Sequence, residues 1–474
     1  MNHGIYVSEQ ATAVSTPAVA ESGVPFVVGI APVFAADAPA ETGMPVICTG
    51  WSEAVSKLGY SDDWEGYTIS EFMYSHFKLF GMQPAIFVNV LDLTKSAHKT
   101  TVAAADIDVA DHKAALASGA IDDNTLVVKN KPQSGTASTL VKGTDYDTFY
   151  DGDKLVVELL SGSTYYSDAK LNIAYTKANP AGVTDAEIAA GIEAAELCAA
   201  KIGTVPDLIC VPGFSHKSAI AAAMAAKAAG INGMFKAKAV IDIDSSTVTA
   251  YTAVAAAKAS AGFTDENEIV CWPMLKLGDY VFHMSTQLAG LMAKVDTENG
   301  GTPCESPSNK GFKADGVVLA DGTEVNLTLA QANILNGAGV VTALAFLNGL
   351  TAWGDWTACW PGNTDVKDYF IPVSRMFDFV GNTLIRTFWT KLDEPMNRRL
   401  IDTIIDTANI WLNGLVGSGY LIAARAEMSE DENPITDLMA GRIKIHVYIT
   451  PPSPAREIDF MLEYDASALV EAFS

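Results

Sequence analysis

Residues 207–213 read DLICVPG, an apolar run closed by proline and glycine. A short apolar run between turn residues is typical of a strand that is buried on both faces. The alanine-rich segment 215–229 follows and is predicted to form a helix, with Ser215 as its N-cap. Apolar runs at 236–244 and 267–273 predict two more strands of this kind. Strands that alternate with helices in this way predict an α/β sheet covered on both faces.

The same alternation begins near residue 24, so we assign residues 24–94 together with 181–350 to one central α/β domain. The residues between these two parts, 95–180, carry short β-like runs separated by turn clusters such as KPQSG and SGS. This spacing predicts an inserted β-rich sandwich module. The elements expected before the insertion are strands at 24–31, 44–50 and 84–91 and helices at 52–58 and 69–79.

The last part of the chain, 351–474, has a different pattern and is assigned to a C-terminal domain. Helices are predicted at 375–391 and 395–412, and the second is expected to have Asp393 as its cap and Pro395 in its first turn. Two strands are expected after these helices, which makes this domain α+β. The whole chain is therefore predicted to be a multidomain protein that combines α/β and α+β parts.

Three segments near the chain ends alternate between apolar and polar side chains, as half-buried strands do. They are residues 3–10, 442–450 and 458–464. The first belongs to an N-terminal arm, 1–23, in which residues 11–22 have the composition of a linker. This N-terminal strand has no partner close to it in the sequence. Apolar residues that share one face are Ile443, Ile445, Val447 and Ile449 in the second segment and Ile458, Phe460, Leu462 and Tyr464 in the third.

The composition limits the class of function. The formal net charge is −25, which argues against general nucleic-acid binding because phosphate contacts need lysine and arginine. The six cysteines are widely spaced and predict neither a disulfide scaffold nor a zinc site. No signal-peptide pattern and no apolar run of about 18 residues is found. We therefore expect folding in a cytoplasm and no insertion into a membrane.

No motif for catalysis, cofactor binding or metal binding is found, including the P-loop, HExxH, EF-hand and GxSxG patterns. Asp242 and Asp244 end a predicted strand, where α/β enzymes place catalytic groups, but acidic residues also cap strand ends. Ser215 and His216 follow the strand at 207–213, and Ser215 is better explained as a helix cap. We predict no catalytic residue, no cofactor and no metal.

The chain resembles the tail sheath proteins of contractile-tailed phages and related contractile injection particles. The similar segments run along most of the chain in the expected order, and the insertion is the least similar part. They are HGIYVSE at 3–9, DLICVPG at 207–213, EIVCWPMLKLGD at 268–279, GLMAKVDTENGGTPCESPSNKG at 290–311, ILNGAGVVTALAFLNGLTAWGDWT at 334–357, SGYLIAARAEMSEDENP at 418–434 and GRIKIHVYITPPSPAREIDFMLEYD at 441–465.

The resemblance implies a subtilisin-like central fold and a structural protein that is not an enzyme. It implies a homo-oligomer of stacked rings that forms a helical tube and exchanges strands between subunits. The alternative for these strands is pairing within one chain. The residues implied in exchange are Gly4, Ile5, Tyr6, Val7 and Ser8 in the N-terminal strand, Ile443, Ile445, Val447 and Ile449 in the first C-terminal strand, and Ile458, Phe460 and Leu462 in the second.

The resemblance also implies partners: a tail tube protein inside the sheath, and baseplate and tail terminator proteins at its ends. Contraction would drive the tube through a target cell envelope, with the linker at 11–22 as the hinge. Lys391, Arg398 and Arg399 are candidates for contact with an acidic tube surface, or else form ion pairs on a solvated helix face. The expected location is a virion tail or a contractile particle, assembled in the host cytoplasm.

Two other functions remain open from the sequence alone. One is a hydrolase-like enzyme on the α/β core with a β-rich accessory domain, which needs a convergent catalytic cluster. The other is a different self-assembling shell protein, which would keep the strand addition but have no tail tube.

Overall fold

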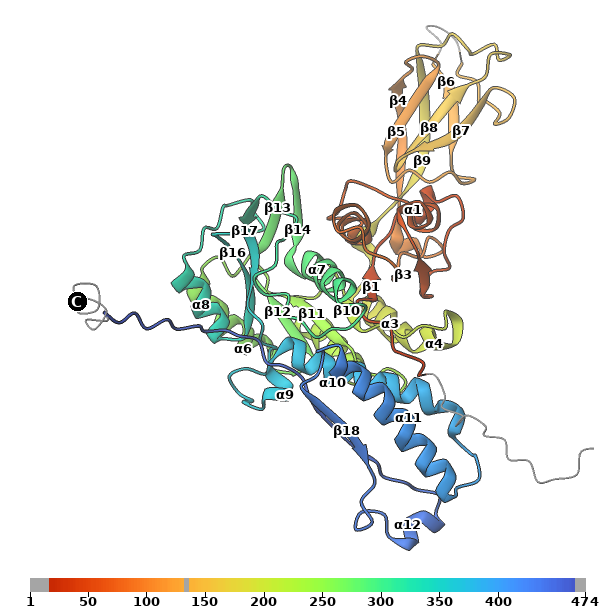
Figure 1. The fold of residues 1–474 in the computed structure, drawn as a ribbon. Helices are drawn as coiled ribbons and strands as arrows, with labels where there is room; N and C mark the ends of the chain where they lie inside the picture. Colours follow the sequence, from red (N-terminus) through yellow and green to blue (C-terminus); the bar gives the residue numbers. More distant parts are fainter. Residues whose placement is uncertain (1–16, 132–135, 465–474) are drawn as a thin grey trace, which may run out of the picture.

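The computed structural model describes residues 17–131 and 136–464 of the chain (Figure 1). At its centre is an eight-stranded sheet in the order β17-β16-β12-β11-β10-β1-β3-β2. The six inner strands are parallel to one another, and the edge strands β2 and β17 run antiparallel to their neighbours. The strands are β1 (Pro25–Gly29), β2 (Val46–Cys48), β3 (Ala85–Asn89), β10 (Leu208–Cys210), β11 (Lys238–Asp242), β12 (Glu268–Cys271), β16 (Val340–Phe346) and β17 (Gly349–Trp353).

Helices cover both faces of this sheet. Along β1, Phe26 and Val28 point into a core shared with α3, α5, α6 and α8, whereas Val27 points into a core shared with α1, α2 and α7. Strands buried on both faces explain the continuous apolar runs, and the predicted mixed α/β architecture is confirmed. The helices are α1 (Trp51–Leu58), α2 (Thr68–Met73), α3 (Asp185–Glu193), α4 (Cys198–Lys201), α5 (Ser218–Ala229), α6 (Tyr251–Ala261), α7 (Met284–Glu298) and α8 (Leu329–Gly337).

Two helix predictions in the central region need correction. The segment predicted as one helix at 69–79 is an α-helix, α2, that continues as a π-helical turn over Tyr74–Leu79. Helix α5 begins at Ser218, three residues after the predicted cap. Ser215 does not cap it, because its hydroxyl donates a hydrogen bond to Asp242 and accepts one from the Asp242 N–H, both at 3.1 Å.

Two smaller groups of strands are attached to the core. A three-stranded sheet, β14-β13-β15, lies beside α7. Residues 99–178 form two further three-stranded sheets, β4-β9-β6 and β5-β8-β7, which enclose a separate apolar core and project away from the central sheet (Figure 1). The strands are β4 (Lys99–Asp108), β5 (Lys113–Ser118), β6 (Val127–Asn130), β7 (Tyr146–Asp151), β8 (Lys154–Leu159), β9 (Lys170–Ala178), β13 (Met274–Leu277), β14 (Tyr280–His283) and β15 (Gly316–Val318).

The C-terminal region packs two long helices against a hairpin (Figure 1). The helix predicted at 395–412 is Arg398–Gly417, and its cap is Asn397, whose side chain accepts a hydrogen bond from the Leu400 N–H at 2.9 Å. Asp393 is instead part of the preceding turn, with a left-handed φ of 64°. The elements are α9 (Val366–Tyr369), α10 (Ile371–Phe388), α11 (Arg398–Gly417), β18 (Ala423–Glu427), α12 (Ile435–Met439) and β19 (His446–Thr450).

Candidate assembly interface

Two short strands form a hairpin at the end of the C-terminal region. β18 and β19 pair antiparallel, with Ala426 opposite Val447. One face of the hairpin packs on α10 and α11 through Ala426 and through Ile445, Val447 and Ile449, whereas Tyr448 stays exposed on the other face. The predicted alternation of apolar and polar residues at 442–450 therefore matches the packed and exposed faces of this hairpin. Ile443, Ile445, Val447 and Ile449 are all half-buried.

The strand predicted at 442–450 is paired with another strand only from His446 onward, because β18 ends opposite it at Glu427. The backbone before it pairs with a side chain. The Asn433 amide donates to the Lys444 carbonyl at 3.0 Å and accepts from the Lys444 N–H at 2.8 Å. Asn433 is buried, so one amide takes the place of a strand partner there.

The two outer edges of the hairpin differ. On β18 the Asn409 amide of α11 donates to the Ala426 carbonyl at 2.9 Å and accepts from its N–H at 2.7 Å, so the middle of this edge is closed. The outer edge of β19 has no strand partner among residues 17–131 and 136–464. A two-stranded ribbon is marginal by itself and is stabilised by additional strands. The open β19 edge is therefore the place where another strand can add.

The segment that follows β19 has the side chains such a strand needs. Residues 458–464 were predicted to form a strand, but they pair with no strand in the described part of the chain. Their apolar side chains are in solvent: Ile458 is 70% exposed, Phe460 82% and Leu462 96%. The segment forms no strand within residues 17–131 and 136–464, because no other strand in these ranges pairs with it to complete its hydrogen bonds.

The start of this C-terminal segment is held to the loop that follows β17. The Arg456 guanidinium lies 3.5 Å from the centre of the Trp356 ring, and its Nε is 3.3 Å from the Asp355 carboxylate. Trp356 in turn packs on Trp360, with 4.2 Å between ring centroids. Burial raises the pKa of Asp355, and Arg456 acts against that rise. A cation over an aromatic ring beside a buried carboxylate fixes the point where the segment leaves the molecule.

The N-terminal strand, Gly4 to Ser8, lies outside the described residues, so its partner stays a prediction. The linker predicted at 11–22 is shorter than expected, because its last residues are bonded to the core. Backbone N–H groups of Ala18 and Ala20 donate to threonines of α10, and Ser22 donates to Asp296. Residues 18–24 are therefore held on the core, and residues 11–16 lie outside the described residues.

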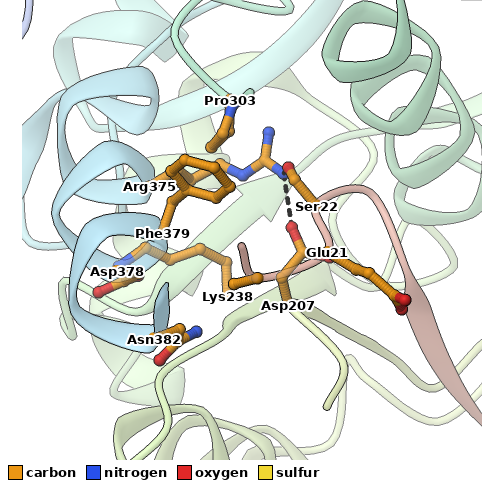
Figure 2. Close-up of a pocket in the computed structure, with 10 residues that line it drawn as sticks. Glu21, Ser22, Asp207, Lys238, Pro303, Arg375, Asp378, Phe379 and Asn382 are labelled. Atoms are coloured by element: carbon orange, nitrogen blue, oxygen red, sulfur yellow. Dashed lines mark hydrogen bonds and ion pairs between the residues drawn. The ribbon is translucent and has the colours of Figure 1, made fainter. Parts of the chain in front are cut away.

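A buried ion cluster joins three regions at this point (Figure 2). Arg375 of α10 donates to Asp296 of α7 at 2.9 Å and to Asp207, just before β10, at 2.7 Å. Ser22 of the N-terminal arm lies beside the same guanidinium at 3.4 Å. Burial raises the pKa of Asp296, and the Arg375 guanidinium opposes that rise. The cluster ties the C-terminal helices, the central sheet and the N-terminal arm into one unit.

The pocket beside this cluster is lined by residues from the same three regions, including Lys238 and Asp378, which form an ion pair at 2.9 Å (Figure 2). Its cavity volume is about 10 Å³. That is at the lower limit for a single water molecule, so the pocket has no room for a substrate or cofactor.

The three candidate tube-contact residues are on the surface near the start of α11. Lys391 pairs with Glu394 at 3.1 Å, and Arg398 pairs with Asp402 at 3.0 Å. Arg399 is exposed. These pairs are compatible with a solvated helix face, and the contact with a tube protein stays a prediction.

Two of the residues considered for catalysis, Asp242 and Ser215, hydrogen-bond to one another, and Asp242 also bonds to the start of α7. The Asp242 carboxylate accepts hydrogen bonds from the Ser285 N–H at 2.9 Å and from the hydroxyls of Ser285 and Ser215. Ser285 lies in the first turn of α7, where a carboxylate is stabilised by the free N–H groups and the helix dipole. Both serines are buried, and neither hydroxyl has a hydrogen bond to a histidine. A nucleophile needs a base within hydrogen-bond reach, and His216 makes no such contact here.

No group of three or more histidine, cysteine, aspartate or glutamate side chains in the described ranges is placed to hold a metal ion. In those ranges no helix combines the length and the apolar character that a membrane crossing requires.

The fold is that of sheath subunits from contractile particles. The contracted sheath of the anti-feeding prophage has a TM-score of 0.58 and 15% identity, and the match covers 98% of this chain and 99% of that one. The contracted sheath of the PVC extracellular contractile injection system also has a TM-score of 0.58, with 13% identity and 99% coverage of both chains.

The amino-acid sequence has a relative of the same kind. The tail sheath protein of Burkholderia phage BcepMu is 24% identical over 492 aligned residues, which cover 99% of this chain and 98% of that protein. No protein-family model matches the chain. The relative and the two structures confirm the resemblance to contractile-tail sheath proteins.

Proposed function

We propose that this protein is the structural subunit of a contractile sheath, which polymerises helically around an inner tail tube and contracts to drive the tube through a target cell envelope. The full-length relative carries the name tail sheath protein, and the fold is shared with two contracted sheaths. Such relatives are structural proteins, so we propose no enzymatic activity. The central domain is proposed to be a subtilisin-like fold without its chemistry.

One observation carries the proposal: an open strand edge and an unpaired apolar strand segment occur in the same chain. The β19 edge offers free N–H and C=O groups, and residues 458–464 offer alternating apolar side chains. Burial of Phe460 or Leu462 on a neighbouring subunit contributes about 1.5–3 kcal/mol each. We propose that the C-terminal segment of one subunit adds to the β19 edge of another, and that the strand from Gly4 to Ser8 links to a further subunit.

This contact joins different surfaces of two copies, so it does not close on itself. A heterologous contact of this kind propagates into rings and tubes. The proposed partners are therefore further copies of this chain, a tail tube protein inside the sheath, and baseplate and tail terminator proteins at its ends. Lys391, Arg398 and Arg399 remain proposed contacts with the tube protein. The proposed location is a phage tail or another contractile particle assembled in the host cytoplasm.

The ion cluster at Arg375 supports contraction by movement of whole subunits. Because this cluster ties α10 to the central sheet and to residues 18–24, these parts move together. We propose that subunits rotate as rigid bodies while the exchanged strands stay paired.

Electron microscopy of the purified protein at increasing concentration tests the function. We expect hollow tubes from the wild-type protein and none from the double variant Phe460→Ser, Leu462→Ser, because the variant removes the apolar face of the exchanged strand. Met461→Ser is the matched control, since Met461 is 85% exposed in the same segment and lies on the opposite face of an extended strand.

The control is expected to form tubes as the wild type does. A wild-type protein that stays monomeric at every concentration, with and without tube protein, would contradict the proposed function. Tubes from the double variant would exclude the C-terminal segment as the strand that links the subunits.

A further inference from the structure

The connection between β19 and the C-terminal segment is short and stiff. Residues 451–455 read PPSPA, so three prolines stand in five positions directly after Thr450. Proline fixes φ, has no N–H for a strand ladder, and pushes the residue before it into an extended conformation. Pro451, Pro452 and Pro454 therefore keep this spacer extended and oppose a turn that would bring the segment back beside β19.

Arg456 ends the spacer and fixes its far end. Its contacts with Trp356 and Asp355 hold it on the loop after β17, next to the Trp356–Trp360 pair. From there the segment runs past α9 and α8, away from the β18–β19 hairpin (Figure 1). The apolar residues of the segment and the edge that suits them thus lie on different sides of the same chain.

This separation matters because a flexible connection would favour pairing within the chain. A flexible tether of six residues has a root-mean-square length of about 13 Å, which is enough to return to the adjacent strand edge. Its effective concentration at that edge would be of the order of millimolar, well above the micromolar concentration of a second copy. The edge would then be closed by the chain's own segment.

We propose that Arg456 and the proline spacer hold the C-terminal segment away from its own β19 edge, so that this edge is left open for a second copy of the chain. The spacer and the Arg456 contacts form a restraint against self-pairing. This inference rests on the proposed sheath function, and it adds what prevents a subunit from closing its own interface.

Hydrogen–deuterium exchange of the dilute monomer tests the restraint directly. The variant replaces Pro451, Pro452 and Pro454 by glycine and carries Arg456→Ala. In the wild-type monomer we expect fast exchange at residues 457–464. In the variant we expect exchange at least tenfold slower at residues 457–464 and 446–450, because the two segments pair within the chain.

Tube formation gives the second measurement. We expect the variant to need at least a tenfold higher concentration than the wild type to form tubes. Lys170→Ala is the matched control, because it also removes a surface cation paired with one aspartate, in the β-rich insertion and far from the segment, and it is expected to change neither measurement. Unchanged exchange in the strands of the central sheet shows that the variant is folded.

The two proposals fail in different ways. If the wild type forms no tubes, the proposed sheath function is wrong. Hydrogen–deuterium exchange of the monomer still tests whether the spacer and Arg456 prevent self-pairing. If the variant monomer exchanges as fast as the wild type at residues 457–464, the restraint is overturned even where tubes form. If the variant with three glycines does not fold, the single variant Arg456→Ala is measured instead. It is also expected to slow exchange at residues 457–464.

Discussion

His76 is a fully buried histidine in the π-helical turn after α2. Neither ring nitrogen has a hydrogen-bond partner among the described residues, and the ring packs 5.5 Å from Phe72. Burial lowers the pKa of His76 to about 4. In the unfolded chain a histidine has a pKa of about 6.5, so only the unfolded chain takes up this proton between pH 6.5 and 4.

The free energy of unfolding is therefore expected to fall by roughly 3 kcal/mol through this one residue as the pH drops from 6.5 to 4. His76→Leu keeps an apolar side chain in the site and removes the titration. We predict that the difference in stability between pH 7 and pH 4 is smaller in the variant by about that amount. Urea unfolding at a series of pH values measures it.

His283 provides a control with the opposite sign. Burial acts to lower its pKa, but the Glu71 carboxylate, 2.8 Å from Nδ1, raises it to about 9. The contribution of this pair to stability is complete below pH 6.5 and is lost as the pH rises to 9. His283→Gln is therefore expected to flatten only the alkaline side of the profile. An equal acid slope in His76→Leu and the wild type would show that His76 is already protonated in the folded protein.

Arg375 connects the C-terminal helices to the central sheet and to the N-terminal arm. Arg375→Met leaves Asp296 buried without its partner and is expected to destabilise the protein by about 3–5 kcal/mol. The double variant Arg375→Met, Asp296→Asn removes the uncompensated charge, so its loss is predicted to be smaller than that of the single variant. Thermal or urea unfolding of the wild type, Arg375→Met, Asp296→Asn and the double variant gives the coupling energy between the two side chains. Strictly additive losses would mean that the two side chains do not act as a pair.

The positions of helices and strands follow from local sequence patterns, whereas their exact ends and the pairing of strands do not. The run 207–213 contains β10, because an apolar run between turn residues has few alternatives in a covered sheet. Helix α11 begins three residues later than the predicted start at 395, since Asp393 and Asn397 are both good caps and only the turn geometry separates them. Alternation predicted strands at 442–450 and 458–464, and the structure has a strand only at His446–Thr450. Pairing depends on partners that are distant in sequence or in another chain.

The residues that shape the candidate interface are harder to predict from the sequence. Asn409 and Asn433 act through backbone bonds to a single distant residue, and asparagine in a helix or loop is common for many reasons. Arg456 was visible after PPSP, but its stacking on Trp356 needed the fold. The side chains that close or hold a strand edge are therefore found only when the strands are in place.

Asn433 gives the prediction that belongs to the element scale. Asn433→Ala leaves the N–H and the carbonyl of Lys444 without their partner, at a cost of about 1–3 kcal/mol. We expect hydrogen exchange at residues 443–446 to become at least tenfold faster while α11 is unchanged. Asn433→Asp accepts from the N–H but cannot donate to the carbonyl, so its effect is predicted to be intermediate. Equal exchange in all three proteins would show that the amide contributes nothing to the hairpin.

At the scale of the molecule, the β-rich insertion is attached to the core by few contacts. Its two ends meet where Lys99 pairs with Ala178, and neighbouring strands lie about 5 Å apart. The contacts with the core include a hydrogen bond of 2.6 Å between Ser61 and Asp153 and the packing of Phe34 against Tyr150. Most of its apolar side chains form a core of their own, and Ile121 packs into one of the two cores of the central sheet.

Because the insertion has its own core and adjacent ends, it is expected to be removable. We predict that a chain in which residues 100–177 are replaced by Gly-Ser folds, keeps the exchange protection of the central strands and forms tubes at the same concentration as the wild type. Circular dichroism, exchange and electron microscopy measure these properties. Ser61→Ala cuts one contact and retains the insertion, so it separates loss of that contact from loss of the whole module. A shortened chain that folds but forms no tubes would instead assign the insertion to the contacts between subunits.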